Sequence, residues 1–363
     1  MQQATTDVMG ESDVEPLTHT AVDLVGLTRS LVDIDSTTGR EGAAAEFLSE
    51  YLTRLGFAVV EQKVDDHRFN VFATSSPEPA VVYSTHFDCV PPFFPSRVEN
   101  GRIYGRGSCD AKGILAAQVA AADLLRRQGE TRVGLLFVVG EERGSEGAKR
   151  ANLDARGCRY LVNGEPTDRR LGLATRGIQR VVLKAKGRAA HSSFPELGES
   201  AIDKLIDVLM DLRRVEWPSD PVLGRTHYTV GLISGGVAPN VVPPAAQAEL
   251  MFRTVSDAAM VMEILRRFEP RVSVEPILEV PPVRMATVPG FDAAVFPYTT
   301  DIPFLRAWGQ PLLFGPGSIH VAHTSDEFID IREQECAVDD YARLARELLE
   351  SGPADAGNSE RDS

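Results

Sequence analysis

Residues 111–142 read AKGILAAQVAAADLLRRQGETRVGLLFVVGEE, and this stretch decides the fold class of the chain. Its first part carries Ala and Leu at helical spacing and stops at a glycine, which predicts a helix over residues 111–129. The run 132–140 is continuously apolar after its first residue, Arg132, which is typical of a strand buried on both faces of a largely parallel sheet. Glu141 and Glu142 follow that strand directly. The stretch therefore predicts an α/β protein with acidic side chains at the edge of its sheet where ligands usually bind.

The same alternation continues on both sides of this stretch. Helical spacing predicts helices at residues 21–34 and 41–57. Apolar runs predict further strands at residues 57–64, 69–74, 80–86 and 160–165. Helices that cover both faces of one sheet would form a large α/β/α sandwich.

From about residue 174 the pattern changes to a strand, a helix, two strands, a helix and a last strand. The expected elements lie at residues 178–190, 200–215, 226–236, 245–254, 259–268 and 271–280. This is the β-α-β-β-α-β order of a ferredoxin-like α+β domain. After residue 282 we expect a mixed segment at 294–300, a helix at 300–309, a strand at 311–317 and a last helix at 336–350.

These patterns predict a domain inserted into another. We expect residues 19–173 and 283–351 to form a discontinuous catalytic, metal-binding domain, and residues 174–282 to form a dimerisation or lid domain. The two ends of the chain, residues 1–18 and 352–363, are polar and are expected to be disordered.

Composition and charge indicate which classes of partner the chain is suited to. The 363 residues are 43% hydrophobic and 25% charged, with a net charge of -14, so the chain offers no basic stripe for nucleic acid. We find no apolar run long enough to span a membrane, and the polar N-terminus is unlike a secretory signal. The four cysteines form no CxxC pair and are expected to be reduced thiols. We therefore expect a cytoplasmic protein with no nucleic-acid or membrane partner.

One imidazole and several carboxylates follow the expected strands. His86 and Asp88 end the strand at 80–86, Asp110 precedes the long helix, and Glu165 ends the strand at 160–165. Clustered carboxylates are costly to hold together unless cations neutralise them. Their order along the chain therefore suggests a two-metal hydrolytic site.

Taken singly, each of these signals has an ordinary alternative. Asp88 could fix the second ring nitrogen of His86, or the two could form a simple strand-end turn. Asp110 could bridge two metals, or cap the helix that follows it. His323 could be a late ligand or a surface residue, and spacing alone does not separate it from His320.

The paired glutamates and three residues of the inserted domain are further candidates. Consecutive side chains diverge, so one carboxylate of the pair Glu141 and Glu142 could bind a metal while its neighbour reaches a bridging water, although such a pair is also common on surface turns. His191 could donate to a developing oxyanion, or cap a helix. Arg253 could hold a substrate carboxylate through two hydrogen bonds or form an ion pair on its strand, and Asn240 could be a plain turn residue.

Six motifs occur in an order that resembles one known family. They are STHFDCVP (84–91), GRIYGRGSCDAKG (101–113), VVGEERGSEGA (138–148), NGEPTD (163–168), GRAAHSS (187–193) and GPGSIHVAHTSDE (315–327). The chain resembles the M20 metallopeptidases and aminoacylases from about residue 20 to 350. The GPGSI…AH segment is most similar to the group of acetylornithine deacetylase and succinyl-diaminopimelate desuccinylase.

The resemblance implies a set of metal ligands. One metal would be held by His86 and Glu165, and the other by Glu142 and His323, with Asp110 bridging the two. Zn²⁺ is the expected ion, with Co²⁺ or Mn²⁺ as alternatives. The segment around His323 selects it over His320, which stands where the acetylornithine deacetylase branch is expected to have a Glu.

The resemblance also implies roles for the remaining candidates. Glu141 would be the general base, and Asp88 would orient His86. His191 would reach the active site of the partner subunit in a homodimer formed through the inserted domain. The expected substrate contacts are Asn240, Arg253, Gly317 and Ser318.

The implied reaction is hydrolysis of the amide bond of an N-acyl amino acid, with an N-acetylornithine-type substrate first in rank. A dipeptidase, a carboxypeptidase or a succinyl-diaminopimelate desuccinylase would use the same metal ligands. A relative that kept the fold only for binding or dimerisation is the alternative from a different class.

Overall fold

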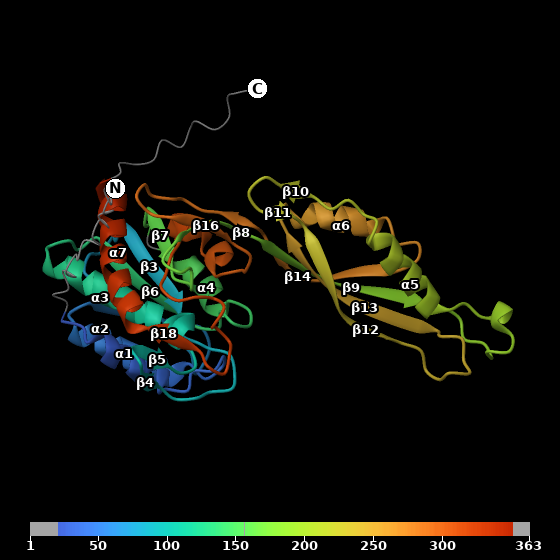
Figure 1. The fold of residues 1–363 in the computed structure, drawn as a ribbon, viewed down its shortest axis with the longest axis horizontal. Helices are drawn as coiled ribbons and strands as arrows, with labels where there is room; N and C mark the ends of the chain where they lie inside the picture. Colours follow the sequence, from blue (N-terminus) through green and yellow to red (C-terminus); the bar gives the residue numbers. More distant parts are fainter. Residues whose placement is uncertain (1–20, 156, 351–363) are drawn as a thin grey trace, which may run out of the picture.

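The computed structural model describes residues 21–155 and 157–350. A larger domain carries both ends of the described chain, and a smaller, elongated domain extends from it (Figure 1). The predictions of disorder for residues 1–18 and 352–363 lie outside the described residues. Among the described residues, no helix is both long enough and apolar enough to cross a membrane.

The larger domain is built on a six-stranded sheet in the order β1-β2-β6-β3-β7-β17. Its strands are β1 (Ala58–Lys63), β2 (Phe69–Thr74), β3 (Val81–His86), β6 (Val133–Val138), β7 (Tyr160–Asn163) and β17 (Gln310–Leu313). Strands β6, β3, β7 and β17 run parallel, whereas β1 and β2 are antiparallel at one edge. The predicted largely parallel sheet is therefore present in its centre.

Helices cover both faces of this sheet. They are α1 (Leu24–Val32), α2 (Gly42–Arg54), α3 (Gly113–Arg127), α4 (Glu146–Ala151) and α7 (Ile331–Glu350). Side chains of α1, α2, α3 and α7 form the main core on one face, and α4 with Trp308 closes the other. Every residue of α3 from Gly113 to Leu125 is buried, which explains why small alanines fill this helix.

Two small sheets and several short turns complete this domain. One sheet joins β4 (Arg97–Glu99), β5 (Arg102–Tyr104) and β18 (Phe328–Asp330), and the other joins β8 (Leu171–Thr175), β15 (Val283–Arg284) and β16 (Ala293–Phe296). The short helical turns are η1 (Ser108–Lys112), η2 (Asn152–Asp154), η4 (Ile302–Phe304) and η5 (Arg306–Trp308). Because β8 pairs with both β15 and β16, it links the chain leaving the larger domain with the chain returning to it.

The inserted part folds as an antiparallel sheet with helices on one face. Its strands β9 (Gly177–Lys186), β12 (His227–Gly235), β13 (Ala245–Thr254) and β14 (Ser273–Val280) take the order β12-β13-β9-β14. Helices α5 (Ala201–Leu212) and α6 (Ala258–Arg266) pack against β9 and β13 through one core. Short elements add η3 (Pro195–Leu197), β10 (Ser219–Asp220) and β11 (Gly224–Arg225). The α/β sandwich with a ferredoxin-like insertion is confirmed.

The structure corrects the expected helix at residues 300–309. The segment forms two short turns, η4 and η5, instead. Pro303 lacks an N–H for a longer helix, and the indole of Trp308 donates to the carbonyl of Ala151, which ties the segment to α4.

The expected start of the last helix also differs from the structure. The last helix begins at Ile331, five positions before residue 336, because Asp330 accepts the backbone N–H groups of Arg332 and Glu333. Lys112, the last residue of η1, is fully buried, and its ammonium group donates to the carbonyl of Ile34.

One hydroxyl links α3, α7 and the segment after β17. Tyr341 Oη donates to the Phe314 carbonyl at 2.6 Å and accepts from Gln118 Nε2 at 3.2 Å. We expect Tyr341→Phe to lower the free energy of unfolding by about 1–3 kcal/mol, because the buried carbonyl loses its donor. Urea unfolding measures this loss. Tyr51→Phe is the control, since that hydroxyl has no hydrogen bond to a described residue; equal losses in both variants would contradict the prediction.

Candidate metal centre

Parallel strands bring the candidate ligands to one edge of the large sheet. His86 is the last residue of β3, Glu142 follows β6, and Glu165 follows β7. These three strands are neighbours and run in the same direction. Their carboxyl ends therefore meet, which is where α/β proteins place their sites.

Five side chains form two groups that share Asp110. The first group is His86, Asp110 and Glu165, and the second is Asp110, Glu142 and His323; in each group the ligand atoms lie within 4.8 Å of one another. His86 Nε2 lies 3.0 Å from one Asp110 oxygen, and His323 Nε2 lies 3.3 Å from the other. The two oxygens of Asp110 therefore face the two groups separately, as a bridging carboxylate would.

Asp110 is not a helix cap. Helix α3 begins three residues later, and Asp110 has a non-helical backbone within η1. The spacing had left both roles open, and the geometry favours the ligand.

The donor set fits two divalent ions. Each group offers one imidazole nitrogen and carboxylate oxygens, which suit Zn²⁺ and several other divalent metals. Within the described residues, the buried Glu165 Oε1 has no hydrogen-bond partner. A buried carboxylate oxygen that no protein group satisfies is consistent with a cation as its partner.

Burial and mutual repulsion raise the pKa values of the acids. Burial raises the pKa of Glu165 and Glu141 well above the ordinary range, and neighbouring acids add to it: Asp110 beside Glu165, and Glu165 beside Glu141. Burial also raises the pKa of Glu142. Burial alone would raise the pKa of Asp110, but hydrogen bonds from His323 and His86 lower it.

The pKa values of the two histidines are raised, although burial alone would lower them. Burial would lower the pKa of His86, yet its contacts with Asp110 and Asp88 raise it. Hydrogen bonds to Asp110 and Glu142 raise the pKa of His323 to about 10. Without metal, the cluster therefore retains protons that a bound ion has to displace.

Asp88 touches three parts of the site. Its Oδ1 lies 3.4 Å from His86 Nδ1 and accepts the N–H of Glu141, while its Oδ2 accepts the N–H of Glu142 and the hydroxyl of Thr38. The His86 ring nitrogen also lies 3.1 Å from the Asp88 carbonyl. Asp88 thus contacts the first histidine and also fixes the turn that carries both glutamates.

Sequence reasoning missed Asp301, another buried acid of this site. Its charge raises the pKa of Glu141 and Glu165, and the neighbouring Ser145 hydroxyl acts to lower the pKa of Asp301 itself. Burial raises its own pKa to about 7. No signal in the sequence marked it, because a charged residue is expected at the surface and only tertiary contacts reveal its burial.

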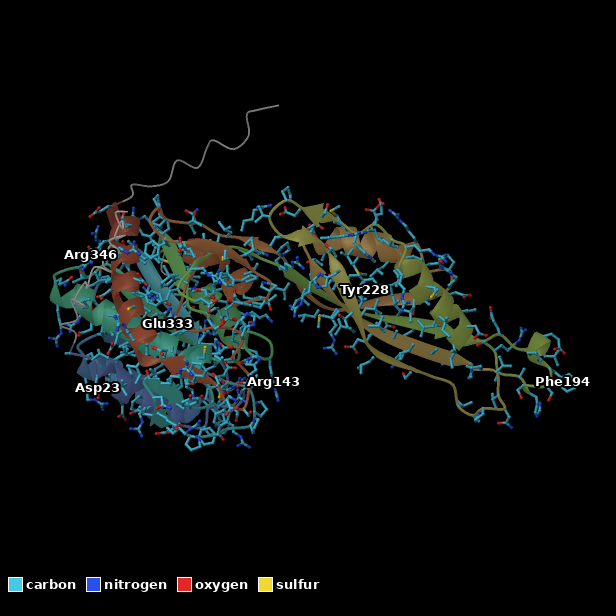
Figure 2. All side chains as sticks on the ribbon, in the orientation of Figure 1. Asp23, Arg143, Phe194, Tyr228, Glu333 and Arg346 are labelled. Atoms are coloured by element: carbon cyan, nitrogen blue, oxygen red, sulfur yellow. The ribbon has the colours of Figure 1, made fainter. Side chains whose placement is uncertain are left out.

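Two candidates lie at the far end of the inserted domain. His191 forms a bridge with Val241, and Ser192 donates to the carbonyl of Asn240, so His191 and Asn240 are neighbours. Phe194, in the same loop, lies at the end of the inserted domain farthest from the larger domain, whereas Arg143, next to Glu142, lies in the larger domain (Figure 2). Within one chain, His191 and Asn240 are not brought to the candidate ligands.

Arg253 occupies the other end of the inserted sheet. It pairs with His227 of β12 and Ile178 of β9, close to where the chain enters this domain. From Ala245 to Arg253, strand β13 spans roughly 25 Å. Arg253 and Asn240 of one chain therefore cannot hold the same small substrate.

Gly317 and Ser318 lie beside the second ligand group. The N–H of Gly317 donates to Glu333, and the carbonyl of Ser318 lies 3.5 Å from Cys109 Sγ, next to Asp110. His320 belongs to neither ligand group. His323, in contrast, belongs to the second group of candidate ligands.

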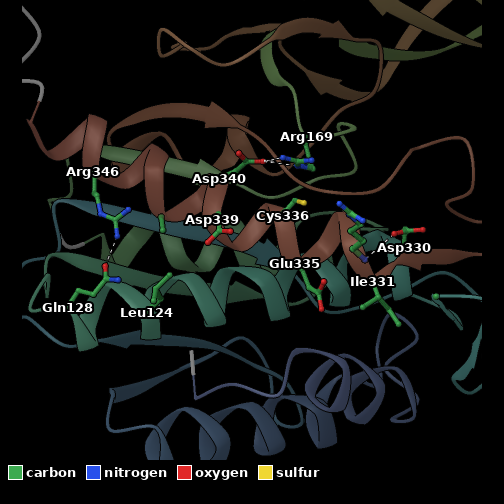
Figure 3. Close-up of a pocket in the computed structure, with 13 residues that line it drawn as sticks. Leu124, Gln128, Arg169, Asp330, Ile331, Glu335, Cys336, Asp339, Asp340 and Arg346 are labelled. Carbon is green, nitrogen blue, oxygen red and sulfur yellow. Dashed lines mark hydrogen bonds and ion pairs between the residues drawn. The ribbon is translucent and has the colours of Figure 1, made fainter. Parts of the chain in front are cut away.

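A separate hollow of about 920 Å³ lies between α3 and α7 (Figure 3). Its walls carry the Arg169–Asp340 ion pair and the Arg346–Gln128 hydrogen bond. None of the candidate ligands lines it, so it is distinct from the metal centre.

The chain is similar to known proteins in sequence and in fold. The family described as "Peptidase family M20/M25/M40" matches residues 82–347. The chain belongs to the M20 peptidase family. It is similar to a probable carboxypeptidase of Aspergillus terreus, with 38% identity over 93% of this chain and 91% of that protein.

Two solved structures share the fold. Aminopeptidase PepT from Bacillus cereus superposes with a TM-score of 0.76 at 20% identity, over 90% of this chain and 98% of the other. A dinuclear metal-binding M20 peptidase from Bacillus subtilis superposes with a TM-score of 0.72 at 16% identity, over 91% and 98%. The M20 prediction is thus confirmed, while the finer assignment to the acetylornithine deacetylase group has no support from these relatives.

The pKa shifts predict how pH acts on the metal-free protein. The raised pKa values of Glu141, Glu142, Glu165, His86 and His323 mean that the folded state holds these protons more tightly than the unfolded chain. Their contribution to stability is fully present below the unfolded values and is lost as pH rises toward about 10, the folded pKa of His323. The lowered pKa of Asp110 has the opposite effect: its contribution to stability is lost as pH falls into the acid range.

We therefore expect the melting temperature of the metal-free protein to fall between pH 5.5 and 8.5, and the gain on adding Zn²⁺ to grow over the same range. Differential scanning calorimetry with and without chelator measures both. A gain from Zn²⁺ that shrinks as pH rises would contradict this assignment.

Proposed function

We propose that this protein is a two-metal carboxypeptidase, which hydrolyses the amide bond before a residue with a free carboxylate. The observation that carries the proposal is the pair of ligand groups joined by Asp110. The name of the similar Aspergillus protein supports the choice of substrate class.

Bound divalent ions would activate a water molecule and polarise the scissile carbonyl. Glu141 is the base that takes the proton of that water and returns it to the leaving amine. Its buried carboxyl has a raised pKa, set by burial and by Glu165, so it can hold a proton between the two steps. Asp88 fixes the backbone of Glu141 and so positions the base.

Arg253 is suited to the substrate carboxylate. Its side chain is half-buried and makes no hydrogen bond or ion pair with a described residue. Burial and the charge of Arg176 lower its pKa, so an incoming anion would relieve an uncompensated charge. A guanidinium can bind a carboxylate through two parallel hydrogen bonds.

N-acyl amino acid deacylation is the second candidate. It removes an acyl group from an amino acid that also keeps a free carboxylate, so the same Glu141 and Arg253 would serve. The GPGSI…AH segment favours an N-acetylornithine-type substrate, and succinyl-diaminopimelate would be cleaved by the same chemistry. A cytoplasmic location and the absence of a nucleic-acid partner stay predictions.

A substrate panel separates these candidates. We expect the Zn²⁺-loaded protein to cleave N-blocked dipeptides with a free C-terminus faster than N-acetylornithine, and to lose at least tenfold in kcat/KM when that carboxylate is amidated, because Arg253 then lacks its partner. Glu141→Gln should abolish turnover while keeping the metal content. Faster cleavage of N-acetylornithine would favour deacylation, and a variant with normal turnover would refute the base.

We also propose that the active form is a homodimer built through the inserted domain. Strand β12 is an unpaired edge of its sheet, and Leu232 and Ile233 on it are more than half exposed. Ile206 and Met210 on α5 are also exposed. A second copy on this edge would cover these side chains, and it could bring His191 and Asn240 to the partner's metal centre.

Mixing two inactive variants tests this arrangement. A heterodimer of Glu141→Gln and His191→Ala subunits holds one complete site if His191 acts on the partner. Equal mixing and subunit exchange should then restore about a quarter of wild-type activity. Each variant alone is the control. No recovery in mixtures shown to contain heterodimer would exclude action across the interface.

A further inference from the structure

Glu327 is a fully buried carboxylate that contacts the backbone of the shared ligand. Its Oε1 accepts the N–H groups of Cys109 and Asp110, each at 3.1 Å. Its Oε2 accepts from Arg106 Nη1 at 2.7 Å. These three hydrogen bonds all go to the segment that carries Asp110.

Arg106 is as deeply buried as its partner. Its side chain is 2% exposed, its Nε donates to the carbonyl of Pro92, and its guanidinium lies 4.9 Å from the centre of the Phe94 ring. Removing such a pair from water costs several kcal/mol per ion, and its mutual attraction often only offsets that cost. The pair is therefore poorly explained as a source of stability alone.

The position of Glu327 in the chain also connects it to the segment that carries His323. It lies four residues after His323, and its own carbonyl accepts the N–H of Gly105. One residue therefore joins the segment 105–110, which carries the bridging candidate, to the segment that carries a ligand of the second group. Neither ligand segment belongs to a long helix or to the central sheet, so their relative placement depends on such contacts.

We propose that Glu327 is a positioning residue for the metal centre: it fixes the backbone at Asp110 so that the two carboxylate oxygens face His86 and His323. The inference rests on the proposed two-metal function and adds the residue that sets its geometry. Residues that orient metal ligands typically change metal affinity ten- to a hundredfold when they are replaced.

The test compares three variants for metal affinity and for the visible spectrum of bound Co²⁺. In Glu327→Gln, the amide NH₂ must face either Arg106 or the two backbone N–H groups, so we expect metal binding about ten- to a hundredfold weaker and an altered Co²⁺ spectrum. In Arg106→Met/Glu327→Gln, the amide oxygen can accept both N–H groups again, and we expect affinity to recover toward the wild type.

Asp123→Asn is the matched control. Asp123 is also fully buried and paired with arginines, but it lies near the far end of α3. We expect this variant to lose stability and to keep the wild-type metal affinity and spectrum. Wild-type affinity in Glu327→Gln, or no recovery in the double variant, would overturn the proposal.

A measurement on the wild-type protein tests the same proposal if a variant does not fold. Amide hydrogen exchange at residues 109–110 should already be slow in the metal-free protein, since Glu327 holds these N–H groups, and Zn²⁺ should change it less than threefold. Fast exchange that only Zn²⁺ suppresses would overturn the positioning role. If the wild type does not bind two ions, the proposed function itself fails.

Discussion

Mutual repulsion among buried acids is the constraint on which this structure depends. Asp88, Asp110, Glu141, Glu142 and Glu165 lie at one edge of a sheet, and burial raises the pKa of the last three. Such a cluster persists only with protons, histidines or cations between the charges. The parallel strands β3, β6 and β7 supply the scaffold that brings them together. The metal centre is thus a consequence of strand direction as much as of residue type.

The two domains carry different candidate site residues. The larger domain holds all candidate ligands and the proposed base, whereas His191, Asn240 and Arg253 all belong to the inserted domain. The length of β13 separates Asn240 from Arg253, so one chain cannot present both to one substrate. In the proposed homodimer, a second subunit on the edge strand β12 would bring together residues that one chain leaves apart.

Periodicity and composition predicted the parts of the fold that depend on apolar pattern. Strands β3, β6 and β7 and helix α3 follow from their apolar runs, and the ligands at their ends follow from parallel topology. The predicted helix at 300–309 was wrong because the apolar residues of this segment pack as two turns around Trp308. Asp301, Lys112 and Glu327 were beyond reach for another reason: charged residues are expected at the surface, and only tertiary contacts reveal their burial.

The chemistry of the site and the choice of substrate rest on different residues. The segment GPGSI had suggested the acetylornithine deacetylase branch of the family, yet local packing also constrains its backbone. Gly317 has a positive φ of 84°, its N–H binds Glu333, and a Cβ there would lie 2.6 Å from Cys109 Sγ. Packing against Asp110's neighbour can therefore explain the glycine without any substrate. The Arg253 side chain makes no hydrogen bond or ion pair with a described residue, and it is the residue from which substrate choice is better argued.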